Sequence, residues 1–195
     1  MIPPTMVRWR PLRQFIIWPA SIVVLCLVAW PVSLHLTGNF HAVLPGEIYR
    51  AAQPDAADLR RWSKEYGIRS VLNLRGAHPD QDWYRHERAT TEELRVVLAD
   101  FALSARHDPG PQRIAELAAL LRRLPKPMLI HCQGGADRTG LAAAVAVAMA
   151  GGGESAAESQ LSFVYGHIGV PVLSSAWAMD QAWEAAEPGL GYPSS

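Results

Sequence analysis

Residues 129–140 read Leu129-Ile130-His131-Cys132-Gln133-Gly134-Gly135-Ala136-Asp137-Arg138-Thr139-Gly140. A short apolar run, typical of a buried strand, ends in His-Cys, and a glycine-bearing loop leads into a small-residue helix expected from about Leu141 to Ala150. Backbone N–H groups that face inward at a helix N-terminus form an anion site. The positive helix end favours a thiolate at Cys132, and Arg138 offers a fork that grips two phosphate oxygens. The stretch therefore predicts a nucleophile aimed at phosphorus.

The pattern His-Cys-x-x-Gly-x-x-Arg-Thr-Gly resembles the signature of the cysteine-dependent protein tyrosine and dual-specificity phosphatases. The resemblance implies that Cys132 attacks phosphorus and that water then hydrolyses the phosphocysteine. It also implies that Thr139 hydrogen-bonds the sulfur and that His131 supports the loop, although His131 fits a core histidine equally well. The implied phosphate-binding residues are Gln133, Gly134, Gly135, Ala136, Asp137 and Arg138. The alternative is a buried cysteine with an unrelated arginine nearby.

The rest of the chain alternates short apolar runs with amphipathic stretches, which favours an α/β fold. We expect a small, mostly parallel central sheet flanked by helices, because strand–helix–strand units imply parallel crossovers. Asp55 is the expected N-cap of the first helix of this domain, and Gly67 ends it. The expected strands are 48–50, 70–74, 94–103 and 128–131, and the expected helices are 55–66, 81–93, 111–124, 141–150, 154–165 and 175–187. Residues 39–45 are expected to form a connecting turn region.

A second motif is Gly46-Glu47-Ile48-Tyr49-Arg50-Ala51-Ala52-Gln53-Pro54, followed later by Asn73-Leu74-Arg75. It is similar to the start of the atypical plant-and-fungal-like dual-specificity phosphatases and their bacterial relatives. The resemblance covers about residues 46–188, within an expected phosphatase domain at 38–188 and before a loose tail at 189–195. The carboxyl ends of parallel strands line the ligand crevice of such sheets. Arg75 and His78 are therefore candidate substrate contacts, although solvated loop charges are equally compatible.

The general acid has two candidates. Ordinary family members carry an aspartate on the loop before the helix that precedes the signature strand, and Asp108 lies there, but closer to the nucleophile in sequence than is typical. Asp137 resembles the acid proposed in the Lys-Asp-Arg loop of a secreted bacterial class active on phosphotyrosine and phosphoinositides, although Ala136 replaces the lysine. A carboxylate inside an anion site suits a protonated acid. We therefore prefer Asp137 to Asp108, with Asp82 and Asp100 behind them.

The N-terminal part of the chain predicts a membrane anchor. No Lys, Arg, Asp or Glu occurs at residues 14–46, and the apolar stretch 15–36 is long enough to span a bilayer as one helix. Trp18 and Trp30 are placed for the two interfaces. We prefer this retained anchor, preceded by a cytoplasmic segment at 1–14, to a cleaved signal peptide or a buried core helix.

Flanking charge predicts the orientation of this anchor. Arg8, Arg10 and Arg13 precede the apolar stretch, and the next Lys or Arg is Arg50. Positive charge is retained on the cytoplasmic side. We therefore expect an N-terminus in the cytoplasm and an exported catalytic domain, which in a bacterium is periplasmic.

The composition argues against several classes of function. The 195 residues include 18 Lys plus Arg and 18 Asp plus Glu, so no basic field predicts nucleic-acid binding. Cys26 and Cys132 suggest no disulfide framework, and no Cys/His spacing resembles a metal site, so we expect neither metal nor cofactor. The expected partners are the membrane and a phosphorylated protein or phospholipid; phosphoinositide, phosphatidylglycerophosphate and envelope-glycan substrates stay open. A rhodanese-like sulfurtransferase and a silent phosphate-binding module are the remaining alternatives.

Overall fold

A five-stranded sheet in the order β1-β2-β5-β3-β4 forms the centre of this computed structural model. The strands are β1 (His41–Leu44), β2 (Ile48–Ala51), β3 (Ser70–Asn73), β4 (Val97–Asp100) and β5 (Met128–His131). β1 is antiparallel to β2, and the other neighbours are parallel. The structure describes residues 18–19, 21–22, 25, 29–30, 32–34, 36–171, 174 and 176–193. The expected small, mostly parallel sheet is confirmed.

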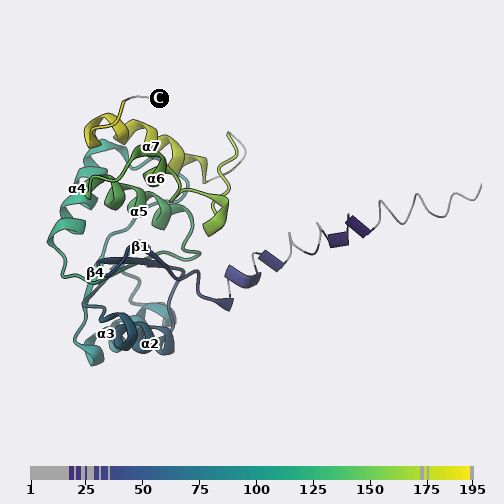
Figure 1. Cartoon of the computed structure of the whole chain (residues 1–195). Coiled ribbons are helices and arrows are strands. Elements are labelled where there is room, and N and C mark those ends of the chain that lie inside the picture. The colour runs from purple at the N-terminus through teal and green to yellow at the C-terminus, as the bar shows by residue number, and fades with distance from the viewer. Residues whose placement is uncertain are drawn as a thin grey trace, which may run out of the picture.

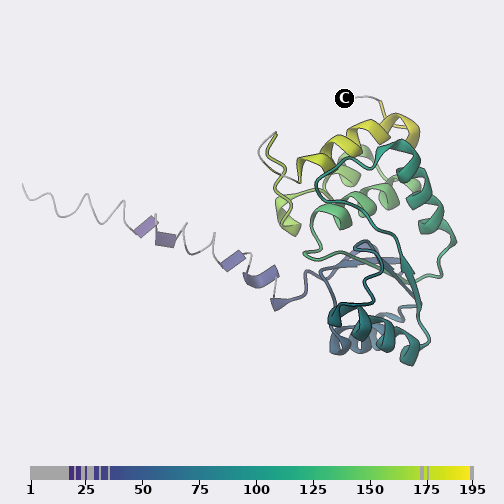
Figure 2. The same cartoon turned by 180° about the vertical axis from the view of Figure 1, so that it is seen from behind.

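Helices cover both faces of this sheet. On one face lie α2 (Ala56–Tyr66) and α3 (Asp82–Leu94), and on the other α4 (Gly110–Arg123), α5 (Asp137–Met149), α6 (Glu154–Glu158) and α7 (Trp177–Leu190) (Figure 1). Figure 2 shows the same two layers from behind. Leu59 and Trp62 of α2 form a core with Leu129. A larger core packs the Ala/Val-rich α5 against α4 and α7.

Strand β5 brings the signature stretch to one edge of the sheet. Each of its four residues is buried, and it lies between β2 and β3. Ala51 and Asn73 pair with His131, so the loop that follows starts beside the carboxyl ends of both neighbouring strands. Ligands bind at this edge in open α/β sheets, as the sequence predicted for this loop.

The caps of α2 form as expected. The carboxylate of Asp55 accepts the backbone N–H of Asp58 at 2.8 Å, which satisfies one of the free donors at the helix start. Gly67 ends the helix with φ +66°, a backbone conformation that favours glycine.

Several predicted boundaries were wrong. The turn region at 39–45 contains β1, in which only Val43 is buried, so the alternation that marks a strand is weak there. The strand expected at 94–103 is confined to β4, because Leu94 completes α3 and Arg95 caps that helix with φ +56°. α5 begins at Asp137 rather than Leu141, because the loop turns directly into the helix.

The C-terminal prediction also needs correction. The helix expected at 154–165 is the short α6, followed by a 3-10 turn, η1 (Phe163–Tyr165). α7 continues through Pro188 to Leu190, and the Tyr192 hydroxyl donates to the Gly152 carbonyl at 2.5 Å, so the expected loose tail is packed against the domain as far as Tyr192. Trp183 of α7 is buried in the larger core.

The expected N-terminal segment, residues 1–14, lies outside the described residues. The expected anchor, residues 15–36, lies partly outside them. The described residues between 18 and 36 are helical. Several of their apolar side chains are exposed, including Trp18, Leu25 and Leu36. Within the described part of the chain, no helix is both long enough and apolar enough to cross a membrane.

Candidate active site

The loop after β5 has four consecutive carbonyl groups, of residues 133–136, held from outside. The pairs are Gln53 N to Gln133 O at 3.1 Å, Asn39 Nδ2 to Gly134 O at 3.0 Å, and Arg50 Nη2 to Gly135 O and Ala136 O at 2.9 and 3.3 Å. In a planar trans peptide the next N–H points opposite to the carbonyl. The N–H groups of residues 134–137 therefore face the inside of the loop and form a cup that can hold an anion.

Gly135 allows this loop to sit tightly against the end of β2. Its φ is +69°, and a Cβ at this position would lie 2.6 Å from the carbonyl carbon of Ala51 and from the nitrogen of Ala52. Neither backbone atom can retreat without disturbing the strand. The glycine of the signature is thus required by both conformation and space.

Cys132 and Arg138 flank the cup. Cys132 is 3% exposed and starts the loop. The Nη1 of Arg138, in the first turn of α5, donates to the carbonyls of Leu74 at 3.4 Å and Leu103 at 3.3 Å. Its Nε and the Thr139 hydroxyl are buried without a hydrogen-bond partner among the described residues. Buried donors of this kind need an acceptor, and a phosphate oxygen or the Cys132 sulfur suits them.

Arg50 of β2, which was not predicted to belong to the site, holds the loop carbonyls from outside the cup. It is fully buried, and its guanidinium lies 3.8 Å from the ring centroid of Tyr165. Besides the two loop carbonyls, it donates through Nη1 to the backbone and side-chain oxygens of Gln160 at 2.8 and 2.9 Å. Burial lowers the pKa of Arg50 to about 10, so the group stays charged at neutral pH. A charged residue inside a strand as short as Ile-Tyr-Arg-Ala was the available signal.

A buried polar chain connects β5 to the neighbouring loop. The His131 Nε2 lies 2.5 Å from Glu87 Oε1 of α3, as an ion-pair contact outside hydrogen-bond geometry. The other oxygen of Glu87 accepts from Gln53 Nε2 at 3.2 Å, and Gln53 Oε1 accepts from Arg75 at 2.8 Å. His131 is therefore a partnered buried histidine that fixes the strand end.

The two candidate substrate contacts differ. The guanidinium of Arg75 lies 3.4 Å from the Trp83 ring centroid. Arg75 is linked to the phosphate cup through Gln53, whose side chain accepts from Arg75 at 2.8 Å and whose backbone N–H donates to the Gln133 carbonyl at 3.1 Å. Burial, and then repulsion by Arg138, lower the pKa of Arg75. His78 is exposed and contacts the Arg75 carbonyl at 3.2 Å. The geometry brings Arg75 to the site and leaves His78 at its edge.

Asp137 is part of a three-residue cluster that the sequence did not reveal. Its Oδ1 lies 2.8 Å from His167 Nδ1, and the Nε2 of that ring lies 3.0 and 3.2 Å from the two Asp180 oxygens. Because both nitrogens face carboxylates, the ring can donate to both only as an imidazolium. Gly169 makes room, since a Cβ there would meet Asp180 Oδ2 at 1.9 Å.

The other aspartates have structural partners. Asp108 is exposed, and its Oδ1 accepts the Gly110 N–H at 2.8 Å where α4 begins. Asp100 accepts from Asn73 at 2.8 Å and from the Tyr84 hydroxyl at 2.5 Å. Burial, and then this bond, raise the pKa of Tyr84 to about 12. Asp82 forms an exposed ion pair with Arg85.

The cluster around His167 gives a pH-dependent prediction. Burial opposes its charge, but the hydrogen bond with Asp137 and the charge of Asp180 outweigh it, so the pKa of His167 is raised above 6.5. A raised folded-state pKa stabilises the fold fully below the unfolded value and loses that contribution as the pH rises through the folded value. We expect the drop in melting temperature caused by His167→Gln to be largest below pH 6.5 and to shrink above it.

Thermal unfolding of the full chain in detergent across a pH series measures this difference. His86→Gln, at an exposed position on α3, is the matched control. A melting difference for His167→Gln that stays constant or grows with pH would contradict the imidazolium assignment.

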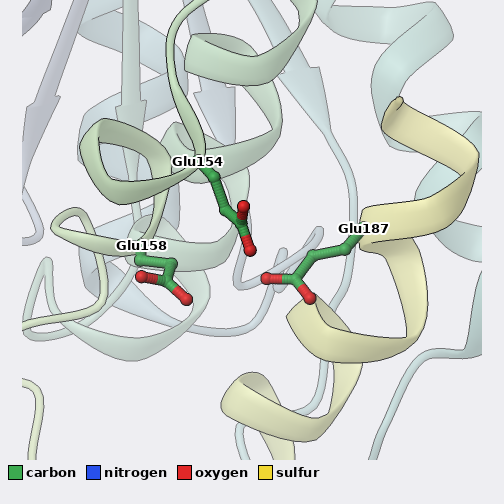
Figure 3. Close-up of side chains that lie close together, drawn as sticks. All are labelled: Glu154, Glu158 and Glu187. Atoms are coloured by element: carbon green, nitrogen blue, oxygen red, sulfur yellow. The ribbon is translucent and has the colours of Figure 1, made fainter. Parts of the chain in front are cut away.

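Away from this loop, three glutamates converge. Glu154 and Glu158 of α6 and Glu187 of α7 point toward one another (Figure 3), and each offers an oxygen within 4.8 Å of the others. They are the one group with metal-binding spacing in the described part of the chain. Acidic groups often gather without an ion, and the cluster contains no residue of the cup. The chemistry of the cup itself rests on a thiol, a guanidinium and backbone donors.

A cysteine and an arginine on a loop of inward N–H groups, between a parallel strand and a helix, define a cysteine-based phosphate-handling site. The model of the tyrosine phosphatase family matches residues 34–158, which is more than half of the sequence. The chain belongs to this family and is a cysteine-dependent phosphatase. The resemblance found in the signature is thereby confirmed. No curated protein matches the chain.

Solved structures share the fold. P. aeruginosa TpbA has a TM-score of 0.59 and 22% identity, over 79% of this chain and 89% of its own. A TpbA variant with serine for cysteine, in complex with phosphotyrosine, has a TM-score of 0.53 and 22% identity, over 76% and 90%. The core catalytic domain of the PP-IP phosphatase SIW14 from S. cerevisiae has a TM-score of 0.59 and 16% identity, over 74% and 85%.

Proposed function

We propose that the chain hydrolyses phosphomonoesters through a phosphocysteine intermediate at Cys132. The sulfur attacks phosphorus as the bond to the leaving oxygen breaks, and water then cleaves the phosphorus–sulfur bond to release phosphate. The cup N–H groups and Arg138 hold the equatorial oxygens, and such preorganised donors are worth roughly 3–4 kcal/mol each. The Thr139 hydroxyl donates to the departing sulfur in the second step.

The main support for this proposal is that four successive loop carbonyls accept hydrogen bonds from outside the loop, which orients the backbone N–H groups of the loop inward. A phosphate-binding module without catalytic activity would contain the same cup, so the deciding experiment measures turnover. Release of inorganic phosphate from p-nitrophenyl phosphate, with acid-quench trapping of a labelled cysteine, tests it. Binding of phosphate without release would favour the module, and turnover of thiosulfate alone would favour a sulfurtransferase.

We assign the general acid to Asp137. Its side chain is 32% exposed and borders a cavity of about 360 Å³ beside the loop. The imidazolium of His167 can supply the proton that the carboxyl group delivers to the leaving oxygen. In the second step the same carboxylate accepts a proton from the attacking water. Asp108 is the alternative, since it lies on the loop that carries the acid in related enzymes.

The leaving group separates these two aspartates. Asp137→Asn is expected to slow hydrolysis of phenyl phosphate by about 10²–10⁴-fold, the usual contribution of a general acid. The loss should be smaller with p-nitrophenyl phosphate, whose leaving group needs less protonation. Asp108→Asn is the matched control and should lose little with either substrate. If Asp108→Asn instead shows the loss that depends on the leaving group, Asp108 is the general acid. If neither variant shows such a loss, the general acid is another residue.

For the substrate, we propose phosphotyrosine on a protein, with dual specificity as a variant of the same activity. The complex of the TpbA variant with phosphotyrosine supports this choice. Arg75, stacked on Trp83 beside Arg138, adds a cation for a second acidic group near the phosphate. Phospholipid, phosphoinositide and envelope-glycan phosphates are the alternatives. Comparing kcat/KM over phosphopeptides, phosphoinositides and phosphatidylglycerophosphate tests the choice.

We also propose that residues 15–36 anchor the chain in a membrane, with the N-terminus cytoplasmic and the catalytic domain exported. Support comes from the uncharged stretch at 14–46 and from the three arginines before it. A reporter enzyme that is active only outside the cytoplasm, fused after Ser195, should be active. An inactive reporter in an expressed fusion would reverse the orientation.

A further inference from the structure

An exposed apolar surface lies next to the phosphate loop. Four large apolar side chains of the segment 163–170 are exposed: Phe163 52%, Val164 52%, Ile168 56% and Val170 42%. We call these four residues the apolar patch. They belong to a stretch, 159–179, with no Lys, Arg, Asp or Glu. Clustered exposed apolar side chains of this kind mark an interaction surface.

The patch is continuous with the proposed anchor. The Trp30 ring stacks on Phe163 with centroids 6.1 Å apart and an interplanar angle of 18°. Its indole Nε1 also donates to the Phe163 carbonyl at 3.2 Å. Closer to the domain, Leu34 approaches Gly166 and borders the cavity that the loop residues Gly134 and Asp137 also line. Two segments without Lys, Arg, Asp or Glu thus meet beside the active site.

The position of Trp30 within the anchor sets the depth of the patch. Trp30 lies six residues before the outer end of the proposed span at Leu36, or about 9 Å at 1.5 Å per helical residue. Membrane-surface elements bury their apolar faces about 5–10 Å into the boundary between headgroups and acyl chains. A side chain stacked on Trp30 is therefore held at that depth, where aromatic rings are favoured and charges are costly.

We propose that the apolar patch inserts into the outer leaflet of the bilayer, so that the catalytic loop works at the membrane surface. The inference rests on the proposed anchor and goes beyond it, because an anchor alone leaves the domain free to stand away from the lipid. The phosphate esters within reach are then those carried at or near the bilayer surface.

Spin labels on the full chain, reconstituted in phosphatidylethanolamine–phosphatidylglycerol vesicles, test this contact. Labels are attached at Val164→Cys or Ile168→Cys in a background that carries Cys26→Ser and Cys132→Ser. The matched control is Val97→Cys, because Val97 is a similarly exposed apolar side chain on β4 (45%). The ratio of oxygen accessibility to that of a water-soluble nickel complex should be several-fold higher at 164 and 168 than at 97.

Each outcome is decisive. Equal ratios at all three sites in vesicles that float with the protein would overturn the patch and leave the anchor standing. Labels at 164 and 168 shielded from both oxygen and nickel would mean a protein cover, such as a second copy, and would also overturn it. Chain that does not float with vesicles would remove both the anchor and the patch. Turnover of p-nitrophenyl phosphate by the wild-type chain, which retains Cys132, reports separately on the catalytic proposal.

Discussion

Cys132→Ser is expected to abolish turnover of p-nitrophenyl phosphate, with a fall on the order of 10⁴-fold or more, as is usual when a covalent nucleophile is removed. A serine hydroxyl is not ionised at neutral pH, so it cannot replace a thiolate as the attacking group. The loop conformation should survive, because its carbonyl bonds come from Gln53, Asn39 and Arg50 rather than from the thiol.

Binding separates lost chemistry from a lost fold in this variant. Cys132→Ser should still be stabilised by phosphate or vanadate in thermal unfolding, since a ligand that binds only the folded state raises the melting temperature. Cys26→Ser, which removes the other cysteine of the chain, is the matched control and should keep full activity. Turnover retained by Cys132→Ser would exclude Cys132 as the nucleophile.

The sequence was sufficient for the parts of the site that are contiguous along the chain. Cys132, Arg138 and the intervening loop lie in one stretch, and the apolar run before them predicted the strand that positions them. Asp55 and Gly67 were predictable for the same reason, because a helix cap depends on a few neighbouring residues.

The sequence was not sufficient where distant segments meet. The pairing of Asp137 with His167 joins residues thirty positions apart, and nothing local distinguishes His167 from a loop histidine. Glu87 reaches His131 from α3, and Asn39 reaches the loop from the start of the domain. The start of β4 was mispredicted because Leu94 adjoins the apolar residues from Val96 onward in sequence, whereas in the fold Leu94 ends α3 and Arg95 takes the αL conformation that caps that helix.

The role of Arg50 could not be predicted from the sequence either. The motif that contains it resembles a family motif, but the role of Arg50 follows only from the fold, which brings β2 beside the loop and Gln160. The guanidinium is the sole cation that the described contacts give to the Gly135 and Ala136 carbonyls. It therefore links the core of the domain to the orientation of the catalytic donors.

Arg50→Met keeps most of the side-chain volume and removes every donor. Each buried carbonyl left unpaired costs about 1–3 kcal/mol, so the free energy of unfolding should fall by several kcal/mol. The cup should also lose its fixed geometry, and loss of one well-placed donor typically lowers kcat about 10²–10³-fold. Arg50→Lys should fall between the wild type and Arg50→Met, because an ammonium group retains the charge but not the planar fork.

Steady-state kinetics well below the melting temperature, together with vanadate affinity, separate these two effects of Arg50→Met. Arg60→Met is the matched control, because the ion pair of Arg60 with Glu93 is exposed and exposed pairs contribute little. If Arg50→Met melts earlier yet keeps kcat and vanadate affinity, the arginine is a core residue and the cup is held by its other contacts. If kcat and vanadate affinity both fall while Arg50→Met is still folded, the buried Arg50 cation fixes the orientation of the N–H donors that bind the transferred phosphoryl group.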